Sequence, residues 1–353
     1  MFTLNDKIKD LTPYEPNENI YKIRLDANES FLKVPDYVMA EAYKQFGSLS
    51  LNRYPDPKAA KLCESFAKCY DLDPKNVAAG NGSDELISII ANSFLMADEK
   101  YAAFSYDFSM YDFYGHLAGA VGVKIPQNEG FSVDVDRVIS VCKAENVRLL
   151  IFSNPCNPTS LGIDRENVRK IITSLENTLI VLDEAYMDFW DQSLLSEVSD
   201  YDNLIILRTC SKAFGLAALR IGFAVANERL INVIKAVKSP FNVNSISQLI
   251  AGTVLRHRGE FAAAQGQIAL SLKTLQSGLE ALNEKYGSPM VILKSCTNFV
   301  TVRYSESKEL FEYLKSVGIA VRFFGSFLRI TCGTKEENTQ VLRFIEKYLA
   351  KDF

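Results

Sequence analysis

The stretch NLIILRTCSKAFGLAALRIGFAVAN, residues 203–227, holds two continuous apolar runs with a polar segment between them. The runs NLIILRT and IGFAVAN are apolar on both faces, which is typical of strands in a sheet covered by helices. The polar segment brings Thr209, Ser211 and Lys212 to the carboxyl end of the first run. Ligands of open parallel sheets bind outside the carboxyl ends of strands, so this stretch predicts a buried sheet with a site at its edge.

Five further runs of the same kind come earlier in the chain: NVAAG (76–80), YAAF (101–104), AVGVKI (120–125), VRLLIFS (147–153) and TLIVLDE (178–184). Helical patterns alternate with them, one opening at Asp56-Pro57 and another at SDELISIIANSF (83–94). This alternation favours strands joined through helices. We predict an α/β fold in which residues 45–238 form a large domain, with a mostly parallel seven-stranded sheet between helices.

The pattern changes after Ser239. Two long helical patterns follow, at 244–258 and 260–286, with no strand between them. After them come the apolar run TNFVTVRY (297–304) and a helix at 306–316. Short strands in GIAVRF (318–323) and FLRIT (327–331) and a last helix from Glu336 complete the chain. Strands and helices in this order predict a smaller α+β domain. The N-terminal segment is too short for a core of its own, so we assign residues 1–44 and 239–353 to this domain.

The composition of the chain argues against nucleic-acid-binding, membrane-bound and metal-binding classes of protein. The chain has 353 residues, 48% hydrophobic, with a formal net charge of −4 and no basic run with interleaved aromatic residues, which argues against a nucleic-acid partner. We find neither an export signal nor an apolar stretch of about 18–20 residues, so we expect a cytoplasmic protein without a membrane partner. Seven unpaired cysteines and two distant histidines suggest reduced thiols and no metal site.

Lys212 is the first candidate for chemistry. A lysine held away from bulk water and near another cation, Arg220, loses part of its preference for the charged form. The neutral amine can condense with an aldehyde. The hydroxyls of Thr209 and Ser211, together with Arg220, could hold a phosphate group.

Three more strand ends carry polar groups. Asp183 and Tyr186 lie in VLDEAYMDF (181–189), Asn157 lies in SNPCNPTSLG (153–162), and Ser83 and Asp84 lie in GNGSDELI (80–87). The aspartate could keep a pyridine nitrogen protonated, the tyrosine and asparagine could bond a ring oxygen, and amides at a helix start bind anions. Each motif alone has an ordinary explanation as a cap or a turn, but together they suit a phosphorylated pyridine aldehyde.

The order GNGSDE, NPT, DEAY and SKAF…R resembles that of the fold-type I enzymes of the aspartate aminotransferase superfamily, which use pyridoxal 5′-phosphate. Within that group LDANES (25–30), RYPDP (53–57) and LRITCGTKEEN (328–338) resemble the histidinol-phosphate aminotransferases. The resemblance covers about residues 12–345. One departure is Ser160, which stands where the family's NPTG motif has glycine.

The resemblance implies a role for each matching residue. Lys212 would be the Schiff-base lysine and proton shuttle, Asp183 the partner of the ring nitrogen, and Tyr186 and Asn157 the partners of the ring oxygen. The cofactor would further contact Phe108, stacked on the ring, and a phosphate-binding set: Ser83, Asp84, Thr209, Ser211 and Arg220. Tyr54 would reach the phosphate of the neighbouring subunit in a homodimer. The substrate would meet Arg329, Arg322, Asn157 and Tyr14.

The implied reaction is a ping-pong transamination from L-histidinol phosphate to 2-oxoglutarate, a step of histidine biosynthesis. An aromatic amino acid aminotransferase or a threonine-phosphate decarboxylase would have a similar sequence. A non-catalytic regulatory or ligand-binding module of the same fold is the alternative from another class. It predicts a missing lysine or an added DNA-binding domain, whereas Lys212 is present and the chain has no such extra segment.

Overall fold

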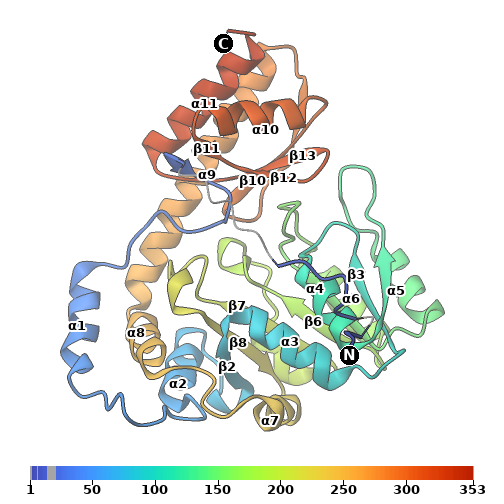
Figure 1. Ribbon diagram of the computed structural model, residues 1–353, viewed down its shortest axis with the longest axis vertical. Coiled ribbons are helices and arrows are strands. Elements are labelled where there is room, and N and C mark those ends of the chain that lie inside the picture. Colours follow the sequence, from blue (N-terminus) through green and yellow to red (C-terminus); the bar gives the residue numbers. More distant parts are fainter. Residues whose placement is uncertain (1, 6, 14–20, 353) are drawn as a thin grey trace.

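The computed structural model describes residues 2–5, 7–13 and 21–352. Its larger part contains a seven-stranded sheet (Figure 1) in the order β2-β8-β7-β6-β5-β3-β4. The strands are β2 (Val77–Asn81), β3 (Lys100–Phe104), β4 (Val121–Ile125), β5 (Leu149–Ser153), β6 (Leu179–Asp183), β7 (Leu204–Thr209) and β8 (Ile221–Ala226). Neighbours are parallel except at β8, which is antiparallel to β2 and β7. All seven apolar runs are strands, and the prediction of a mostly parallel sheet is confirmed.

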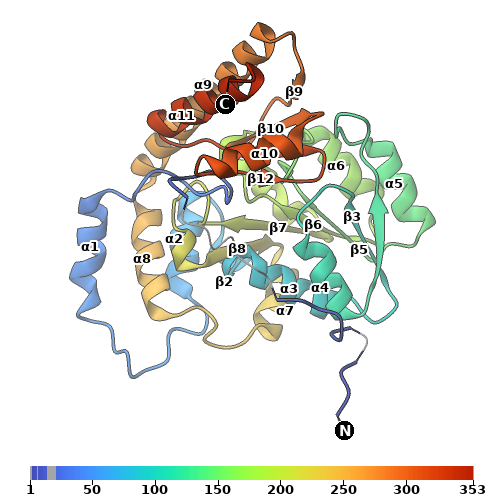
Figure 2. The same ribbon diagram turned by 45° about the horizontal axis from the view of Figure 1, so that its top comes forward.

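Helices cover both faces of this sheet because both faces are apolar. One face packs against α2 (Ala60–Cys69), α5 (Val135–Ala144), α6 (Arg165–Ser174) and α8 (Ser245–Arg256). The opposite face packs against α3 (Gly82–Phe94), α4 (Met110–Ala118) and α7 (Glu228–Val237). Helix α1 (Asp36–Phe46) lies beside α8 at one end of the molecule (Figure 2). Phe66 and Phe223 stack at 3.9 Å in the first of these cores.

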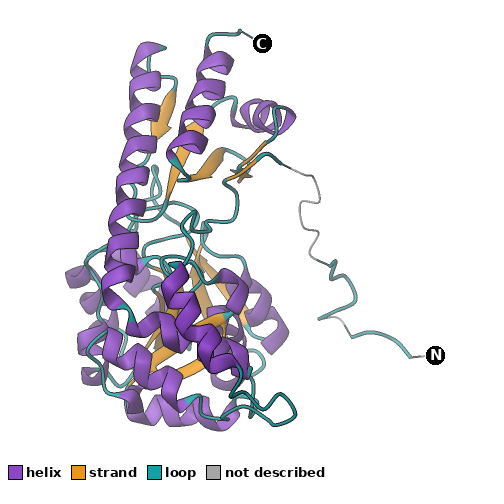
Figure 3. Ribbon diagram, turned by 90° about the vertical axis from the view of Figure 1, so that its left-hand side faces the viewer, coloured by secondary structure: helices purple, strands orange, loops and turns teal. Residues whose placement is uncertain are grey.

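A second, antiparallel sheet lies in the smaller part of the molecule. It has the order β12-β13-β10-β9 and consists of β9 (Met290–Ile292), β10 (Phe299–Tyr304), β12 (Arg322–Phe323) and β13 (Phe327–Thr331). Helices α9 (Arg258–Lys285), α10 (Ser307–Ser316) and α11 (Lys335–Leu349) share a core with it. Strand β1 (Ile23–Arg24) pairs in parallel with β11 (Ile319–Ala320). The longest helix, α9, extends from the larger part into the smaller one (Figure 3).

Some elements differ from the sequence patterns. Helix α2 begins at Ala60 rather than at Pro57, because the Asp56 carboxylate accepts hydrogen bonds from the amides of Lys58 (3.0 Å) and Ala60 (2.7 Å). Strands β1 and β9 have two and three residues and gave no recognisable pattern. The predicted domain limits at residues 45 and 238 remain a prediction. Among the described residues, no helix is both long and apolar enough to cross a membrane.

Gly222 on β8 allows the turn between β2 and α3 to approach the sheet. A Cβ atom at this position would lie 2.3 Å from the backbone nitrogen of Ser83. We expect Gly222→Ala to destabilise the protein by about 1–3 kcal/mol, because backbone atoms cannot move aside as a flexible side chain can. The melting temperature, measured by calorimetry, should fall.

Gly266→Ala is the matched control. Gly266 lies within α9, and a Cβ there would meet nothing within 4 Å. Alanine in a helix interior is favoured over glycine by roughly 0.5–1 kcal/mol, so this variant should melt at the same or a higher temperature. A Gly222→Ala protein as stable as the wild type would contradict the close approach.

Candidate active site

The polar strand-end groups gather at one edge of the seven-stranded sheet. Strands β2 to β7 run in one direction and β8 runs in the opposite one, so β8 begins at the edge where the others end. The segments after β2, β5, β6 and β7, and the residue before β8, therefore meet there. These segments carry Ser83, Asp84, Asn157, Asp183, Tyr186, Thr209, Ser211, Lys212 and Arg220.

Lys212 is half-buried in this cluster. Its Nζ donates a hydrogen bond to the carbonyl oxygen of Ala27 at 2.9 Å and lies 5.9 Å from the centre of the Tyr186 ring. Burial, together with the positive charges of Arg329 and Arg220, lowers the pKa of Lys212 from 10.5 to about 8. A substantial fraction of this amine is thus neutral near physiological pH, as a nucleophilic lysine requires.

Asp183 is buried at the end of β6. Its carboxylate accepts hydrogen bonds from the Tyr111 hydroxyl (2.9 Å) and from the backbone amide of Ala185 (3.1 Å), and it forms no ion pair with any described residue. Burial raises the pKa of Asp183 to about 6. A buried carboxylate without a cation is costly, so this position is suited to a ligand that brings a positive charge.

The hydroxyl of Tyr186 is oriented by the N-terminal segment. Asn28 donates a hydrogen bond to it through Nδ2 at 2.8 Å. Asn28 itself is buried and held by Thr331 of β13, whose hydroxyl donates to Asn28 Oδ1 at 3.0 Å. Because Tyr186 accepts from Asn28, its own hydrogen remains available for a second group.

The start of α3 forms an anion-binding arrangement with Arg220. Gly82 opens this helix with φ +78°, and a Cβ there would lie 2.8 Å from a guanidinium nitrogen of Arg220. Asp84 accepts a hydrogen bond from Tyr114 at 3.0 Å through one oxygen, while its other oxygen is buried without a partner. Free backbone amides at a helix start and a nearby guanidinium both favour a phosphate.

Thr209 and Ser211 lie in the same region and are both buried. The amide of Ser211 donates to the Thr209 hydroxyl oxygen at 3.1 Å, and that hydroxyl donates to the carbonyl of Ile221 at 3.4 Å. The bond to Ile221 ties the end of β7 to the start of β8, next to Arg220. The predicted phosphate-binding residues are therefore close to one another in the fold.

Arg329 enters the site from the smaller part of the molecule. It is 7% exposed and forms no ion pair with any described residue, and its Nε has no hydrogen-bond partner. Its two terminal nitrogens donate to Asn157 Oδ1 and to the carbonyl of Asp26. Burial and the nearby charge of Arg322, its partner across the β12–β13 ladder, lower the pKa of Arg329 to about 10.

The predicted roles of three further residues remain predictions. Phe108 is half-buried after β3, with its ring edge-to-face on Tyr111 at 5.6 Å. Tyr54 is 80% exposed, and its ring stacks on Phe241 at 4.6 Å, so within one chain it faces outward. Tyr14 lies outside the described residues.

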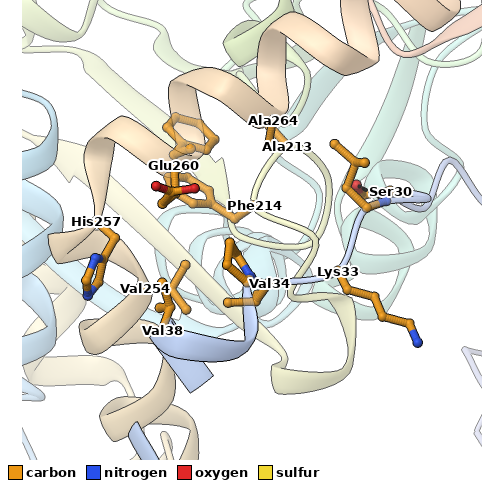
Figure 4. A pocket seen from close by; sticks show the side chains of 13 residues that line it. Ser30, Lys33, Val34, Val38, Ala213, Phe214, Val254, His257, Glu260 and Ala264 are labelled. Atoms are coloured by element: carbon orange, nitrogen blue, oxygen red, sulfur yellow. Dashed lines mark hydrogen bonds between the residues drawn. The ribbon is translucent and has the colours of Figure 1, made fainter. Parts of the chain in front are cut away.

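A pocket lies between residues 30–38, the Ala213–Phe214 segment and helices α8 and α9 (Figure 4). Its lining is mostly apolar and includes Phe214 and Phe261, whose rings stack at 3.7 Å, with His257 and Glu260 beside them. None of the predicted site residues lines it. In the described part of the chain, no group of three His, Cys, Asp or Glu residues is arranged to hold a metal ion.

Comparison with known proteins identifies the family. Residues 20–345 match the family described as aminotransferase class I and II. The chain belongs to the class I and II aminotransferases. It is 38% identical to a histidinol-phosphate aminotransferase of Clostridium novyi over 96% of this chain and 95% of that protein, and 35% identical to one of Thermoanaerobacter pseudethanolicus over 98% of each.

The fold is similar to that of solved aminotransferases. The histidinol-phosphate aminotransferase of Sinorhizobium meliloti, crystallised in complex with pyridoxal-5′-phosphate, superimposes with a TM-score of 0.88 at 23% identity and covers 99% of this chain and 98% of its own. The predicted fold-type I architecture, a large parallel sheet with a smaller α+β part, is thereby confirmed for this aminotransferase.

Several residues that contact the site were not found from the sequence. Asn28, Tyr111, Asp107 and Ser153 all contact a predicted site residue or its backbone. Asp107 follows strand β3 as Asp183 ends strand β6, so a carboxylate after an apolar run was the available signal. Tyr111 and Asn28 lie in a helix and an irregular segment, where the sequence pattern does not show which way a side chain points.

The lowered pKa of Lys212 predicts a pH dependence for its reactivity. In the cofactor-free protein, reductive methylation of Lys212 by formaldehyde should rise with pH, with a midpoint near 8, because only the neutral amine reacts. Mass spectrometry of the peptide that contains Lys212 would measure the extent of modification at each pH.

Arg329→Leu should move this midpoint to higher pH, because it removes a positive charge that disfavours the ammonium form. Arg329→Lys, which keeps the charge, should shift it less. A wild-type midpoint at or above 10 would show that the site does not depress the pKa of this lysine.

Proposed function

We propose that the chain is a pyridoxal-phosphate-dependent histidinol-phosphate aminotransferase, which transfers the amino group of L-histidinol phosphate to 2-oxoglutarate. The observation that carries this proposal is the buried guanidinium of Arg329, which has no anionic partner among the described residues and lies at Asn157. A buried cation without an anion is costly, which supports a role for Arg329 in binding the anionic end of the substrate. The agreement among relatives, 32–38% identical over nearly their full length, supports the choice of substrate.

The residues at the sheet edge fit pyridoxal phosphate. Asp183 is a buried carboxylate in need of a cation, which a protonated ring nitrogen supplies. The α3 start and Arg220 would hold the phosphate. Lys212 would bind the aldehyde carbon through its amine. Phe108 would stack on the ring, and Tyr54 of a second subunit would complete the phosphate site.

Pyridoxal phosphate, when bound, supplies an aldehyde that captures the amino group and a ring that accepts the electron pair of the broken Cα–H bond. The neutral Nζ of Lys212 would serve as the base that accepts the Cα proton of the substrate and as the acid that gives it back. The carboxylate of Asp183 would hold the protonated ring nitrogen. Tyr186 and Asn157 would donate hydrogen bonds to the ring oxygen, since their oxygen atoms already accept from Asn28 and Arg329.

Arg329 would bind the anionic end of either substrate. A guanidinium forms paired hydrogen bonds with a carboxylate or with a phosphate, so one residue can serve both half-reactions. Arg322 lies directly across from Arg329 in the β12–β13 ladder and adds a second positive charge, which favours a dianionic phosphate ester. Tyr14 would contribute from the N-terminal segment.

The same proposal includes a homodimer and a cytoplasmic location. The outward orientation of Tyr54 supports the dimer, because an 80% exposed tyrosine can reach the site of a neighbouring subunit. A biosynthetic transamination draws its amino donor and its 2-oxo acid from the cytoplasm.

A substrate panel tests the proposal. We expect the pyridoxal-phosphate-loaded enzyme to transfer the amino group of L-histidinol phosphate to 2-oxoglutarate at least about 100-fold more efficiently, in kcat/KM, than that of Phe, Tyr or Trp, since only the phosphate ester pairs fully with Arg329 and Arg322. Glutamate formation would be measured by a coupled assay.

Lys212→Ala is the control, and it should lose both activity and the borohydride-reducible bond to the cofactor. Preference for the aromatic amino acids would replace the substrate but keep the reaction class, and release of CO₂ from threonine phosphate would indicate the decarboxylase. A wild-type protein that never binds pyridoxal phosphate would refute the proposal.

Hybrid dimers test the role of Tyr54. Tyr54→Ala and Lys212→Ala dimers should each be nearly inactive when pure. After unfolding and refolding together, random pairing gives hybrids with one site that has both Lys212 and the partner's Tyr54, so about a quarter of wild-type activity should return. No recovery, despite hybrid dimers seen by native mass spectrometry, would place Tyr54 in its own subunit's site or outside both.

A further inference from the structure

Asp107, three residues beyond β3, joins two neighbouring strand ends. Its Oδ1 accepts a hydrogen bond from the amide of Phe108 at 2.8 Å, and its Oδ2 accepts one from the amide of Ser153 at 3.1 Å. The hydroxyl of Ser153 also donates to Oδ1. Ser153 is the last residue of β5, so one carboxylate holds the exits of both strands.

The direction of these hydrogen bonds is determined by chemistry. While Asp107 is ionised, its carboxylate can only accept, and the Ser153 hydroxyl then donates its single hydrogen to Asp107. Its oxygen then accepts the amide hydrogen of Asn157 at 3.0 Å. A change at Asp107 is thereby transmitted to the backbone of Asn157.

Asn157 continues the chain toward the substrate arginine. Its Oδ1 accepts a hydrogen bond from Arg329. Arginine has no acceptor atom, so Asn157 must turn its oxygen toward Arg329 and its NH₂ group away. A continuous chain of hydrogen bonds therefore runs from Asp107, beside the larger sheet, through Ser153 and Asn157. It ends at Arg329 on β13 of the smaller sheet.

The burial of Asp107 is not compensated by an ion pair with any described residue. Burial raises the pKa of Asp107 to about 7, with the charge of Asp183 adding to the effect. A neutral residue would avoid this cost. Hydrogen bonds to a charged acceptor are stronger than those to a neutral one, which suits a group that fixes the position of its neighbours.

We propose that Asp107 is a positioning residue that acts through Ser153 to orient Asn157 and, through Asn157, Arg329. Its carboxylate bonds to Phe108 and Ser153 and has no direct hydrogen bond to Asn157 or Arg329. The inference rests on the proposed function, because that function gives Asn157 and Arg329 their roles. Asp107 would thus help to fix the position of Asn157, in the larger part of the molecule, relative to Arg329, in the smaller part.

The test compares Asp107→Asn and Ser153→Ala with Asp136→Asn in the pyridoxal-phosphate-loaded enzyme. Asp136 is exposed on α5 and pairs with Lys170 at 2.6 Å, so it serves as the matched loss of a carboxylate. Three quantities are measured: KM and kcat for both substrates, the melting temperature, and the calorimetric Kd of 2-oxoglutarate for the pyridoxal form, which has no amino group to transfer.

Asp107→Asn and Ser153→Ala should each raise KM and the 2-oxoglutarate Kd roughly tenfold, with a smaller effect on kcat, because a misplaced Arg329 weakens ground-state binding. The double variant should be no worse than Asp107→Asn alone, since both residues act along one chain of hydrogen bonds. Asp136→Asn should match the wild type.

Additive effects, or a lower melting temperature with unchanged KM and Kd, would overturn the positioning role. If Asp107→Asn does not fold, Ser153→Ala alone decides, because it removes the same link with a smaller change. Should the wild type prefer another amino donor, the proposed substrate fails, yet the 2-oxoglutarate Kd still reports on Asp107.

Discussion

Six strands of the larger sheet share one direction, and the site depends on this alignment. Because β2, β3, β5, β6 and β7 end at the same edge, residues from distant parts of the sequence meet without long connecting loops. The antiparallel β8 adds to this arrangement, since it begins at that edge and brings Arg220 there. The apolar composition that buries the sheet also forces the polar residues to its rim.

The charges at that rim do not balance among themselves. Lys212, Arg220 and Arg329 are positive, whereas Asp183 is held apart from them by its bonds to Tyr111 and to the backbone. The buried charges behind the site, by contrast, are paired with one another. Behind the site, Arg208 contacts both Glu184 and Asp188. This contrast indicates that the unpaired charged side chains at the rim are arranged to pair with charged groups of a bound ligand.

The seven strands could be predicted because each is an uninterrupted apolar run, which buried parallel strands require. Strands β1 and β9, of two and three residues, are absent from the sequence prediction. For the site, strand-end residues such as Asp183 and Lys212 could be nominated, since topology alone brings strand ends together. Asn28 could not, because its approach to Tyr186 depends on how the N-terminal segment crosses between the two sheets.

Ser160, buried in the turn after Asn157, has φ +65°, a left-handed conformation that is easy only for glycine. Serine at this position therefore holds a backbone conformation for which glycine is the usual residue.

Helix α9 touches both parts of the molecule. Near its start Phe261 stacks on Phe214, two residues beyond Lys212, and Gln265 donates to the carbonyl of Asp188 at 2.5 Å. One turn and a half later the Ser271 hydroxyl donates to the carbonyl of Gly333, just beyond β13. At about 1.5 Å per residue its 28 residues form a rod of roughly 42 Å. The segment after Lys212 and the segment after the strand of Arg329 therefore contact the same helix. A rotation of the smaller part that moves α9 would also displace the residues that pack beside Lys212.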